Sequence, residues 1–250
     1  MSFCKDCTSG VIHEGNPEGK IELVGGVRCY VATPTVDYPK DKVLIYLIDI
    51  FGIDFINAQL LADAFARHGF KTIMPDIIDN DPTPLDALDP DTTFDLSAWL
   101  PKHDASSYLP ILHKVFAGFK EDGVTKFAAS GYCYGARPAF DLAFEDKLDV
   151  TIISHPSLLR YPDDIETYKA KSKAPLLINA AEIDDAFPAP ARRQTVDILG
   201  DGKFAPGFEL KLWEGCRHGF VVRGDYSDPK VKAGREGAFK ASVEFLNKHL

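Results

Sequence analysis

The stretch KFAASGYCYGARPAFDLAF, residues 126–144, decides how this chain folds. Its first five residues form a short apolar run typical of a buried strand, and residues 136–144 have the composition of a helix. Between them, GYCYG at 131–135 has the GxSxG spacing with Cys133 at its centre. The flanking glycines suit a strained turn, because a side chain at either place would crowd the neighbouring strand and helix. The stretch therefore predicts a cysteine that projects from a strand–turn–helix unit.

The rest of the chain repeats this alternation of strand and helix. It predicts an α/β fold in a single domain, with a mostly parallel central sheet and helices on both faces. Functional sites in such sheets form at the carboxyl ends of the strands. Further strands are expected at 42–48, 70–74, 150–154, 176–179 and 208–213, and further helices at 57–68, 107–119 and 233–249.

Two segments fall outside the alternating pattern. Residues 1–24 are expected to form an N-terminal leader, followed by the folded domain at 25–250. Residues 80–102, rich in Asp, Pro and Thr, predict an irregular surface excursion that shapes a substrate mouth. The CxxC pair of Cys4 and Cys7 has too few neighbouring ligands for a zinc site, so we interpret it as incidental.

Composition excludes several classes of protein. The 28 Lys and Arg against 37 Asp and Glu give a formal net charge of -9, which disfavours nucleic-acid and membrane partners. The first thirty residues lack a signal peptide, and the apolar runs are too short to span a bilayer. Five cysteines at irregular spacing favour free thiols in a reducing compartment, so we expect a cytoplasmic protein.

A cysteine nucleophile requires a neighbouring base, because a free thiol titrates near ~8.5. The order expected downstream of Cys133 is acid and then histidine. His218 lies in a glycine-bounded loop after the strand at 208–213 and is the best candidate base. His155 follows a strand but precedes every acid loop, and His249 is the penultimate residue. Spacing alone does not choose the acid among Glu182, Asp184 and Asp185.

At this point the motifs resemble those of the dienelactone hydrolase family, in particular its fungal and other eukaryotic branch. The similarity runs from about Gly25 to the C-terminus. DIFG at 49–52 is similar to the family's acidic turn, GYCYG at 131–135 to its nucleophile elbow, DDAFPAPAR at 184–192 to its acid loop, and HGF at 218–220 to its histidine loop.

The resemblance implies an α/β-hydrolase fold and a Cys-His-Asp triad that uses no metal and no organic cofactor. The family's catalytic aspartate lies four residues before the proline of the acid loop, which selects Asp184 here. The expected oxyanion donors are the backbone N–H groups of Ile50 and Tyr134. The residues expected to bind or support the substrate are Asp49, Phe51, Phe220 and Arg223.

The chain departs from the bacterial members of that family at several positions. Asp49 stands where they carry a glutamate that takes the nucleophile's proton. Arg223 lies one residue beyond the place of an arginine that holds the substrate carboxylate, and residues 76–102 contain no second arginine. These differences make dienelactone itself a doubtful substrate.

Taken together, the residues and the resemblance predict a cysteine-dependent hydrolase, a monomer or homodimer, that cleaves a small-molecule ester, lactone or thioester through an acyl-enzyme. Two alternatives from other classes remain open. One is a non-catalytic α/β-hydrolase-fold module that binds a ligand or partner. The other is a thiol redox sensor that uses Cys133 and Cys216.

Overall fold

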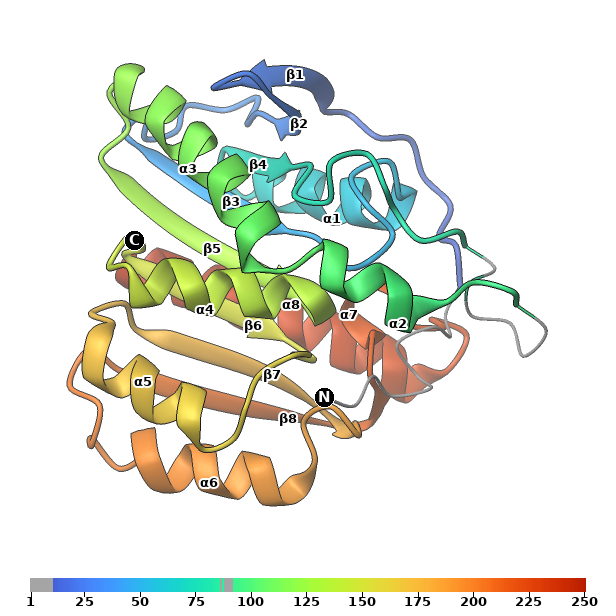
Figure 1. Cartoon of the computed structure of the whole chain (residues 1–250), viewed down its shortest axis with the longest axis vertical. Helices are drawn as coiled ribbons and strands as arrows, with labels where there is room; N and C mark the ends of the chain where they lie inside the picture. The colour runs from blue at the N-terminus through green and yellow to red at the C-terminus, as the bar shows by residue number, and fades with distance from the viewer. Residues whose placement is uncertain (1–10, 86, 88–91) are drawn as a thin grey trace.

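The computed structural model describes residues 11–85, 87 and 92–250, so Cys4 and Cys7 lie outside the described residues. Within these residues, eight strands form one sheet in the order β1-β2-β4-β3-β5-β6-β7-β8 (Figure 1). The first two strands join antiparallel, and the other six run parallel. The strands are β1 Lys20–Val24, β2 Val27–Ala32, β3 Lys42–Leu47, β4 Thr72–Pro75, β5 Lys126–Tyr132, β6 Val150–Ser154, β7 Leu176–Ile183 and β8 Phe208–Arg217.

Helices cover both faces of this sheet (Figure 1). On one face α4 packs between α3 and α5, and on the other α7 packs against α1 and α8. This architecture confirms the predicted α/β fold. The helices are α1 Ile56–Arg67, α2 Leu96–Trp99, α3 Ala105–Glu121, α4 Ala136–Phe144, α5 Asp163–Lys171, α6 Ala189–Leu199, α7 Phe220–Arg223 and α8 Pro229–His249, with 3₁₀ turns η2 Leu100–Lys102 and η3 Cys133–Gly135.

The central strands β3 and β5 pair in parallel from Lys42 and Lys126 to Leu47 and Gly131. Apart from the first residue of each, both strands are buried along their whole length, because helices cover both of their faces. This explains why both strands read as continuous apolar runs rather than as alternating patterns. Their carboxyl ends lie side by side, which brings the turn after β3 next to the turn after β5.

A segment near the N-terminus crosses the outside of α1 and ties it to α7. The buried Asn57 side chain donates to the backbone oxygens of Val11 and Val222 and accepts from the N–H of His13. The N–H of Val11 donates in turn to the oxygen of Arg223. The segment from Val11 to Gly19 is called the strap below, because it fixes α7 from outside.

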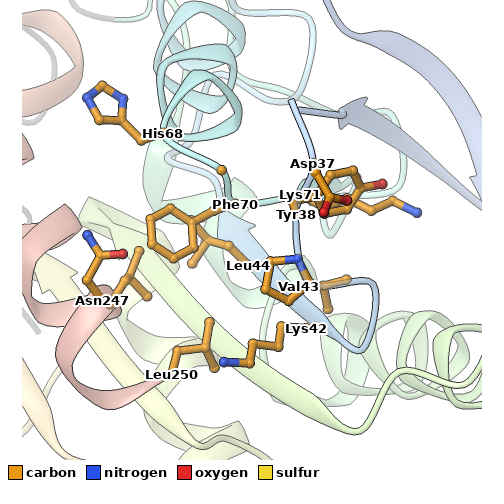
Figure 2. Close-up of a pocket in the computed structure, with 13 residues that line it drawn as sticks. Asp37, Tyr38, Lys42, Val43, Leu44, His68, Phe70, Lys71, Asn247 and Leu250 are labelled. Atoms are coloured by element: carbon orange, nitrogen blue, oxygen red, sulfur yellow. The ribbon is translucent and has the colours of Figure 1, made fainter. Parts of the chain in front are cut away.

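A cavity of about 220 Å³ lies at the amino end of β3 (Figure 2). Val43 and Leu44 at the start of the strand, His68 and Phe70 after α1, and Leu250 line it. Because the parallel strands run away from this point, the cavity is at the opposite end of the sheet from Cys133. None of the described helices is both long and apolar enough to cross a membrane.

Candidate active site

Cys133 lies at the tip of the turn between β5 and α4, with a backbone φ of 52°. A positive φ is costly for a residue with a side chain and persists only where the surrounding structure enforces it. The glycines on either side supply that enforcement. A Cβ on Gly131 would lie 2.4 Å from the oxygen of Gly135, and one on Gly135 would lie 2.1 Å from the oxygen of Leu47. Strand, turn and helix therefore approach too closely for any residue but glycine.

His218 and Asp184 come together from the ends of two neighbouring strands, β8 and β7. The Nδ1 atom of His218 lies 2.9 Å and 3.0 Å from the two carboxylate oxygens of Asp184, and both side chains are fully buried. The N–H of His218 donates to the oxygen of Ile183, which joins the two loops. This arrangement leaves Nε2 of the imidazole directed away from the carboxylate.

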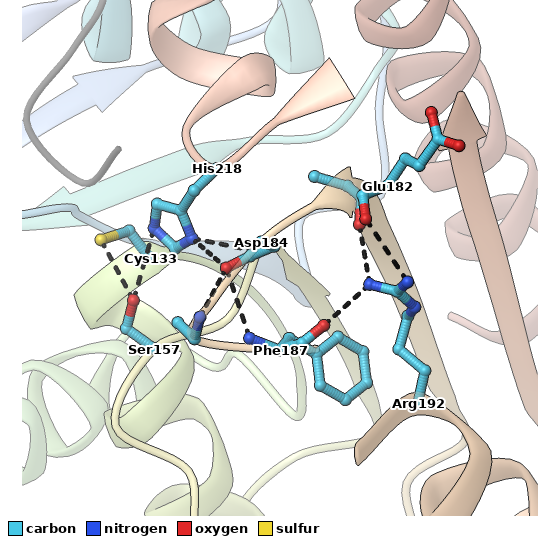
Figure 3. Close-up of polar contacts among 9 residues, drawn as sticks. Cys133, Ser157, Glu182, Asp184, Phe187, Arg192 and His218 are labelled. Carbon is cyan, nitrogen blue, oxygen red and sulfur yellow. Dashed lines mark hydrogen bonds and ion pairs between the residues drawn. The ribbon is translucent and has the colours of Figure 1, made fainter. Parts of the chain in front are cut away.

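The loop that carries Asp184 is held rigid by its own turn and by Arg192 (Figure 3). The Oδ1 atom of Asp184 accepts from the N–H groups of Ala186 and Phe187. The guanidinium of Arg192 donates to the backbone oxygens of Ala181 and Phe187 on either side of the turn. The carboxylate is thereby fixed in one orientation toward the histidine.

On its other side, His218 meets Cys133 and Ser157 (Figure 3). The Oγ atom of Ser157 lies 3.5 Å from the sulfur of Cys133 and 3.4 Å from Nε2 of His218. Burial disfavours the charged imidazolium, but the charges of Cys133 and Asp184 and hydrogen bonds to both outweigh it. Together they raise the pKa of His218 to about 10. The pair thus favours a thiolate beside an imidazolium.

Asp49 and Arg223 form a buried ion pair beside the cysteine. The Nε atom of Arg223 lies 3.4 Å from Oδ2 of Asp49, and both side chains are at most 2% exposed. The carboxylate also accepts from the N–H of Phe51, whose ring faces the guanidinium at 5.1 Å. Burial and the charge of Cys133 together raise the pKa of Asp49 to about 6, against the lowering effect of Arg223.

The two predicted oxyanion residues are hydrogen-bonded to the surface excursion at residues 80–102 and to the residue directly after it. The oxygen of Ile50 accepts from the N–H and the hydroxyl of Thr83. The hydroxyl of Tyr134 donates to the oxygen of His103, directly after the excursion. Their N–H groups follow Asp49 and Cys133, so both belong to the turns at the carboxyl ends of β3 and β5.

The remaining predicted candidates separate clearly by position. Phe220 is buried, with its ring 5.7 Å from that of His155. The ring of His155 in turn lies 5.1 Å from that of His218, and burial lowers its pKa well below 6.5. It is therefore a neutral neighbour of the candidate base. His249 lies in α8 against Phe245 and lines no part of this site.

The other two acids and the second cysteine serve different contacts. Glu182 accepts from the N–H of Gly215, and Asp185 is exposed. Cys216 is buried against α8, so closely that a Cβ on Gly234 would lie 2.3 Å from its sulfur. Burial raises the pKa of Cys216 to about 11. Of the acids after β7, only Asp184 is hydrogen-bonded to His218 among the contacts of the described residues.

Residues that the sequence patterns did not single out complete the site. Ser157 and Thr83 lie on loops that face the site only once the strand order is known. A weak signal exists for Ser157, because it closely follows the strand at Val150–Ser154, next to the elbow strand. No comparable signal points to Thr83.

The three residues at the centre of the site are almost completely buried. Cys133 is 0%, His218 3% and Asp184 4% exposed. A cavity of about 340 Å³ reaches the histidine, and its wall includes His218, Phe220, Arg223 and Val11 of the strap. Within the described part of the chain, no group of three or more His, Cys, Asp or Glu side chains is arranged to hold a metal ion. The chemistry available here is nucleophilic attack by sulfur and proton transfer by imidazole.

Comparisons with known proteins show which family the chain belongs to. Hydrolase tropI from Talaromyces stipitatus is 31% identical, with alignment over 98% of this chain and 95% of that protein. Dienlactone hydrolase 1 from Gibberella moniliformis is 31% identical, over 96% and 92%. A presumed dienelactone hydrolase from Klebsiella pneumoniae shares the fold, with a TM-score of 0.70 at 16% identity over 89% of this chain and 93% of that one.

The model of the dienelactone hydrolase family matches residues 27–250, which is nearly the whole chain and includes every site residue described above. The chain therefore belongs to the dienelactone hydrolase family and is a hydrolase of lactone or ester bonds.

Proposed function

We propose that the chain hydrolyses small-molecule lactones, esters or thioesters with Cys133 as nucleophile, His218 as base and Asp184 as the residue that orients the base. One observation carries the proposal: the continuous run of contacts from Asp184 through His218 to Ser157 and Cys133, which starts from a cysteine held at φ 52°. A buried thiol serving only as core packing needs neither the strained backbone nor the imidazole.

In the first half of the reaction, the Cys133 thiolate attacks the carbonyl carbon and a carbon–sulfur bond forms. The carbonyl π electrons move to oxygen, and the N–H groups of Ile50 and Tyr134 stabilise the resulting oxyanion. The carbonyl re-forms as the carbon–oxygen bond of the ester or lactone, or the carbon–sulfur bond of the thioester, breaks. The imidazolium of His218 gives its Nε2 proton to the departing alkoxide or thiolate, and the acyl group remains as a thioester on Cys133.

In the second half, the now neutral imidazole of His218 takes a proton from water as the water oxygen adds to the thioester carbon. The tetrahedral intermediate collapses and expels the Cys133 thiolate, which restores the thiolate–imidazolium pair. Asp184 keeps its hydrogen bond to Nδ1 throughout and stabilises the charged ring each time it forms. The net change is one water consumed for one acid and one alcohol or thiol released.

Substrate binding is assigned to the cavity next to His218. Phe220 contributes an apolar wall and Arg223 a positive charge there, while Arg223 also pairs with Asp49. Phe51 contacts the same guanidinium and supports its position. A compact acyl group with an apolar body suits a cavity of about 340 Å³ better than a long lipid chain does.

The alternative functions are less well supported. A redox sensor needs a second reactive thiol, and Cys216 is buried with its pKa raised to about 11, which disfavours its thiolate. A non-catalytic binding module would not need the buried carboxylate–imidazole pair. Removing these two groups from water costs desolvation free energy, and apolar residues of similar volume would fill the same space without that cost.

Replacement of Cys133 tests the proposal directly. Cys133→Ala should abolish hydrolysis of p-nitrophenyl acetate, and the same comparison over lactones, aryl esters and thioesters would define the substrate class. Cys29→Ala is the matched control, because Cys29 is an equally buried cysteine on β2 whose pKa burial raises to about 12. Full activity in the Cys133 variant would remove the sulfur from the mechanism.

A further inference from the structure

Ser157 lies beside the Cys133–His218 couple, where its hydroxyl reaches both the sulfur and the imidazole. Its Oγ atom lies 3.5 Å from Sγ of Cys133 and 3.4 Å from Nε2 of His218, and the residue is 1% exposed (Figure 3). These distances are at the long end for hydrogen bonds. Such contacts at active sites commonly shorten when a substrate binds.

The backbone around Ser157 fixes this position. Its N–H donates to the oxygen of Cys133, so serine and cysteine are joined through both main chain and side chain. The loop that carries it has two residues with positive φ, His155 at 39° and Leu158 at 64°. The N–H of His155 donates to the oxygen of Asn179 on β7. A loop bent this tightly aims the hydroxyl at the sulfur.

A hydroxyl at this point fits both protonation states of the couple without moving a heavy atom. In the neutral state the thiol donates to Oγ, and the hydroxyl donates to Nε2. In the charged state the imidazolium donates to the thiolate and to Oγ, and the hydroxyl donates to the thiolate. The change of state transfers one proton from sulfur to Nε2, either directly or by two short transfers through Oγ, and no heavy atom moves. The charged arrangement gains more, because hydrogen bonds to ionised groups are the stronger ones.

We propose that Ser157 is a positioning residue that stabilises the Cys133 thiolate by donating its hydroxyl hydrogen to the sulfur while accepting from the His218 imidazolium. The proposal rests on the nucleophile role of Cys133 and adds the group that sets the resting charge of that nucleophile. It predicts that loss of the hydroxyl, and not merely loss of its volume, decreases the thiolate fraction at neutral pH.

The test is the pH dependence of Cys133 alkylation by iodoacetamide between pH 5 and 10, followed by mass spectrometry of the Cys133 peptide. Ser157→Ala should shift the midpoint upward by about one pH unit and slow labelling roughly tenfold at pH values below the wild-type midpoint, as expected for a lost hydrogen bond to a charged acceptor. Ser157→Thr, which keeps the hydroxyl, should stay near wild type. Ser157→Gly removes the same hydroxyl and takes the place of alanine should that variant not fold.

Ser154→Ala is the matched control. This buried serine is the last residue of β6, three positions before Ser157, and its hydroxyl accepts a hydrogen bond from Asn179 instead of contacting the couple. The ionisable groups that face the couple are Asp49 after β3, His155 after β6, Asp184 after β7 and Arg223 of α7, and none of them is altered in these variants. An unchanged midpoint in Ser157→Ala, or an equal shift in Ser157→Thr, would overturn the proposal. Labelling needs no substrate, so this result is independent of whether Cys133→Ala abolishes turnover.

Discussion

Gly135→Ala should reduce turnover far more than it reduces stability. The added Cβ would lie 2.1 Å from the oxygen of Leu47 and 2.7 Å from that of Ile48, both backbone atoms at the end of β3. It is therefore about 1.3 Å short of the 3.4 Å at which ordinary van der Waals contact begins. No side-chain rotation relieves this contact, so either α4 or the end of β3 must move. Overpacking of this kind costs about 1–3 kcal/mol.

The effect on rate follows from what lies on either side of that contact. The end of β3 leads into Ile50, and the turn η3 directly before α4 carries Tyr134, so a shift of about 1 Å separates the two proposed oxyanion donors. A displacement of that size at a reacting centre costs on the order of 100-fold in rate. Steady-state hydrolysis of p-nitrophenyl acetate and thermal unfolding measure the two effects separately.

The control is Gly26→Ala, where no atom lies within 4 Å of the added Cβ but φ is 79°, which is unsuited to alanine, whereas φ at Gly135 is −61°. This variant should lose stability from backbone strain alone and keep its kcat. If Gly135→Ala retained both wild-type kcat and wild-type Tm, the close approach of β3 and α4 would not hold the site together, and the reasoning from the elbow would be wrong.

Three further outcomes follow from the charges around Cys133. Asp184→Asn should lower kcat roughly 10³–10⁴-fold, because an amide no longer stabilises the imidazolium or its tautomer, and a loss below tenfold in p-nitrophenyl acetate hydrolysis would contradict the role of Asp184. Asp49→Asn should shift the midpoint of Cys133 alkylation to lower pH, because the thiolate raises the pKa of Asp49 and the carboxylate must therefore disfavour the thiolate in return. The inflection that Asp49 causes near pH 6 in the alkylation profile should also disappear. A shift of the midpoint to higher pH would refute this reasoning. The pKa of His218 is about 10, above its ordinary 6.5, so the stabilisation from its protonated form is complete below pH 6.5 and is lost as pH rises through about 10. The Tm should therefore fall more steeply between pH 8 and 10.5 in the wild type than in His218→Gln. Parallel curves of Tm against pH would argue against a charged His218.

The parts of the fold that were predictable from sequence are those with strong local signals. The elbow at Cys133 is defined within five residues, and the buried strands that precede it and follow it are continuous apolar runs. The hairpin of β1 and β2 was missed, because Lys20–Val24 is an edge strand that buries almost none of its side chains and shows no periodicity. Helix α5 was missed for a related reason. Its buried stripe consists of only Asp164, Ile165 and Tyr168 within a highly charged segment.

The sequence predicted the site residues whose role can be assigned from a single loop. It did not predict the contacts that form between two loops far apart in the sequence. Asp184 required the family resemblance, because turn carboxylates at 182–185 look alike in sequence. The contact of Ser157 with Cys133 depends on β6 lying next to β5, which spacing along the chain does not encode. The pairing of Arg223 with Asp49 is non-local in the same way, because it depends on α7 being held against α1, where Asn57 donates to the oxygen of Val222.

The hydrogen bonds between residues 80–103 and the two oxyanion residues have a consequence for how substrate selectivity can change. Thr83 holds one oxyanion residue, Ile50, and the residue just after the excursion, His103, holds the other, Tyr134. The segment predicted to shape the substrate mouth is thus hydrogen-bonded to one of the two residues proposed to stabilise the oxyanion, and the residue directly after it to the other. We expect chimeras in which residues 80–103 are exchanged for those of a relative to change substrate selectivity and kcat together. A lineage that acquires a new substrate must then adjust both properties at once.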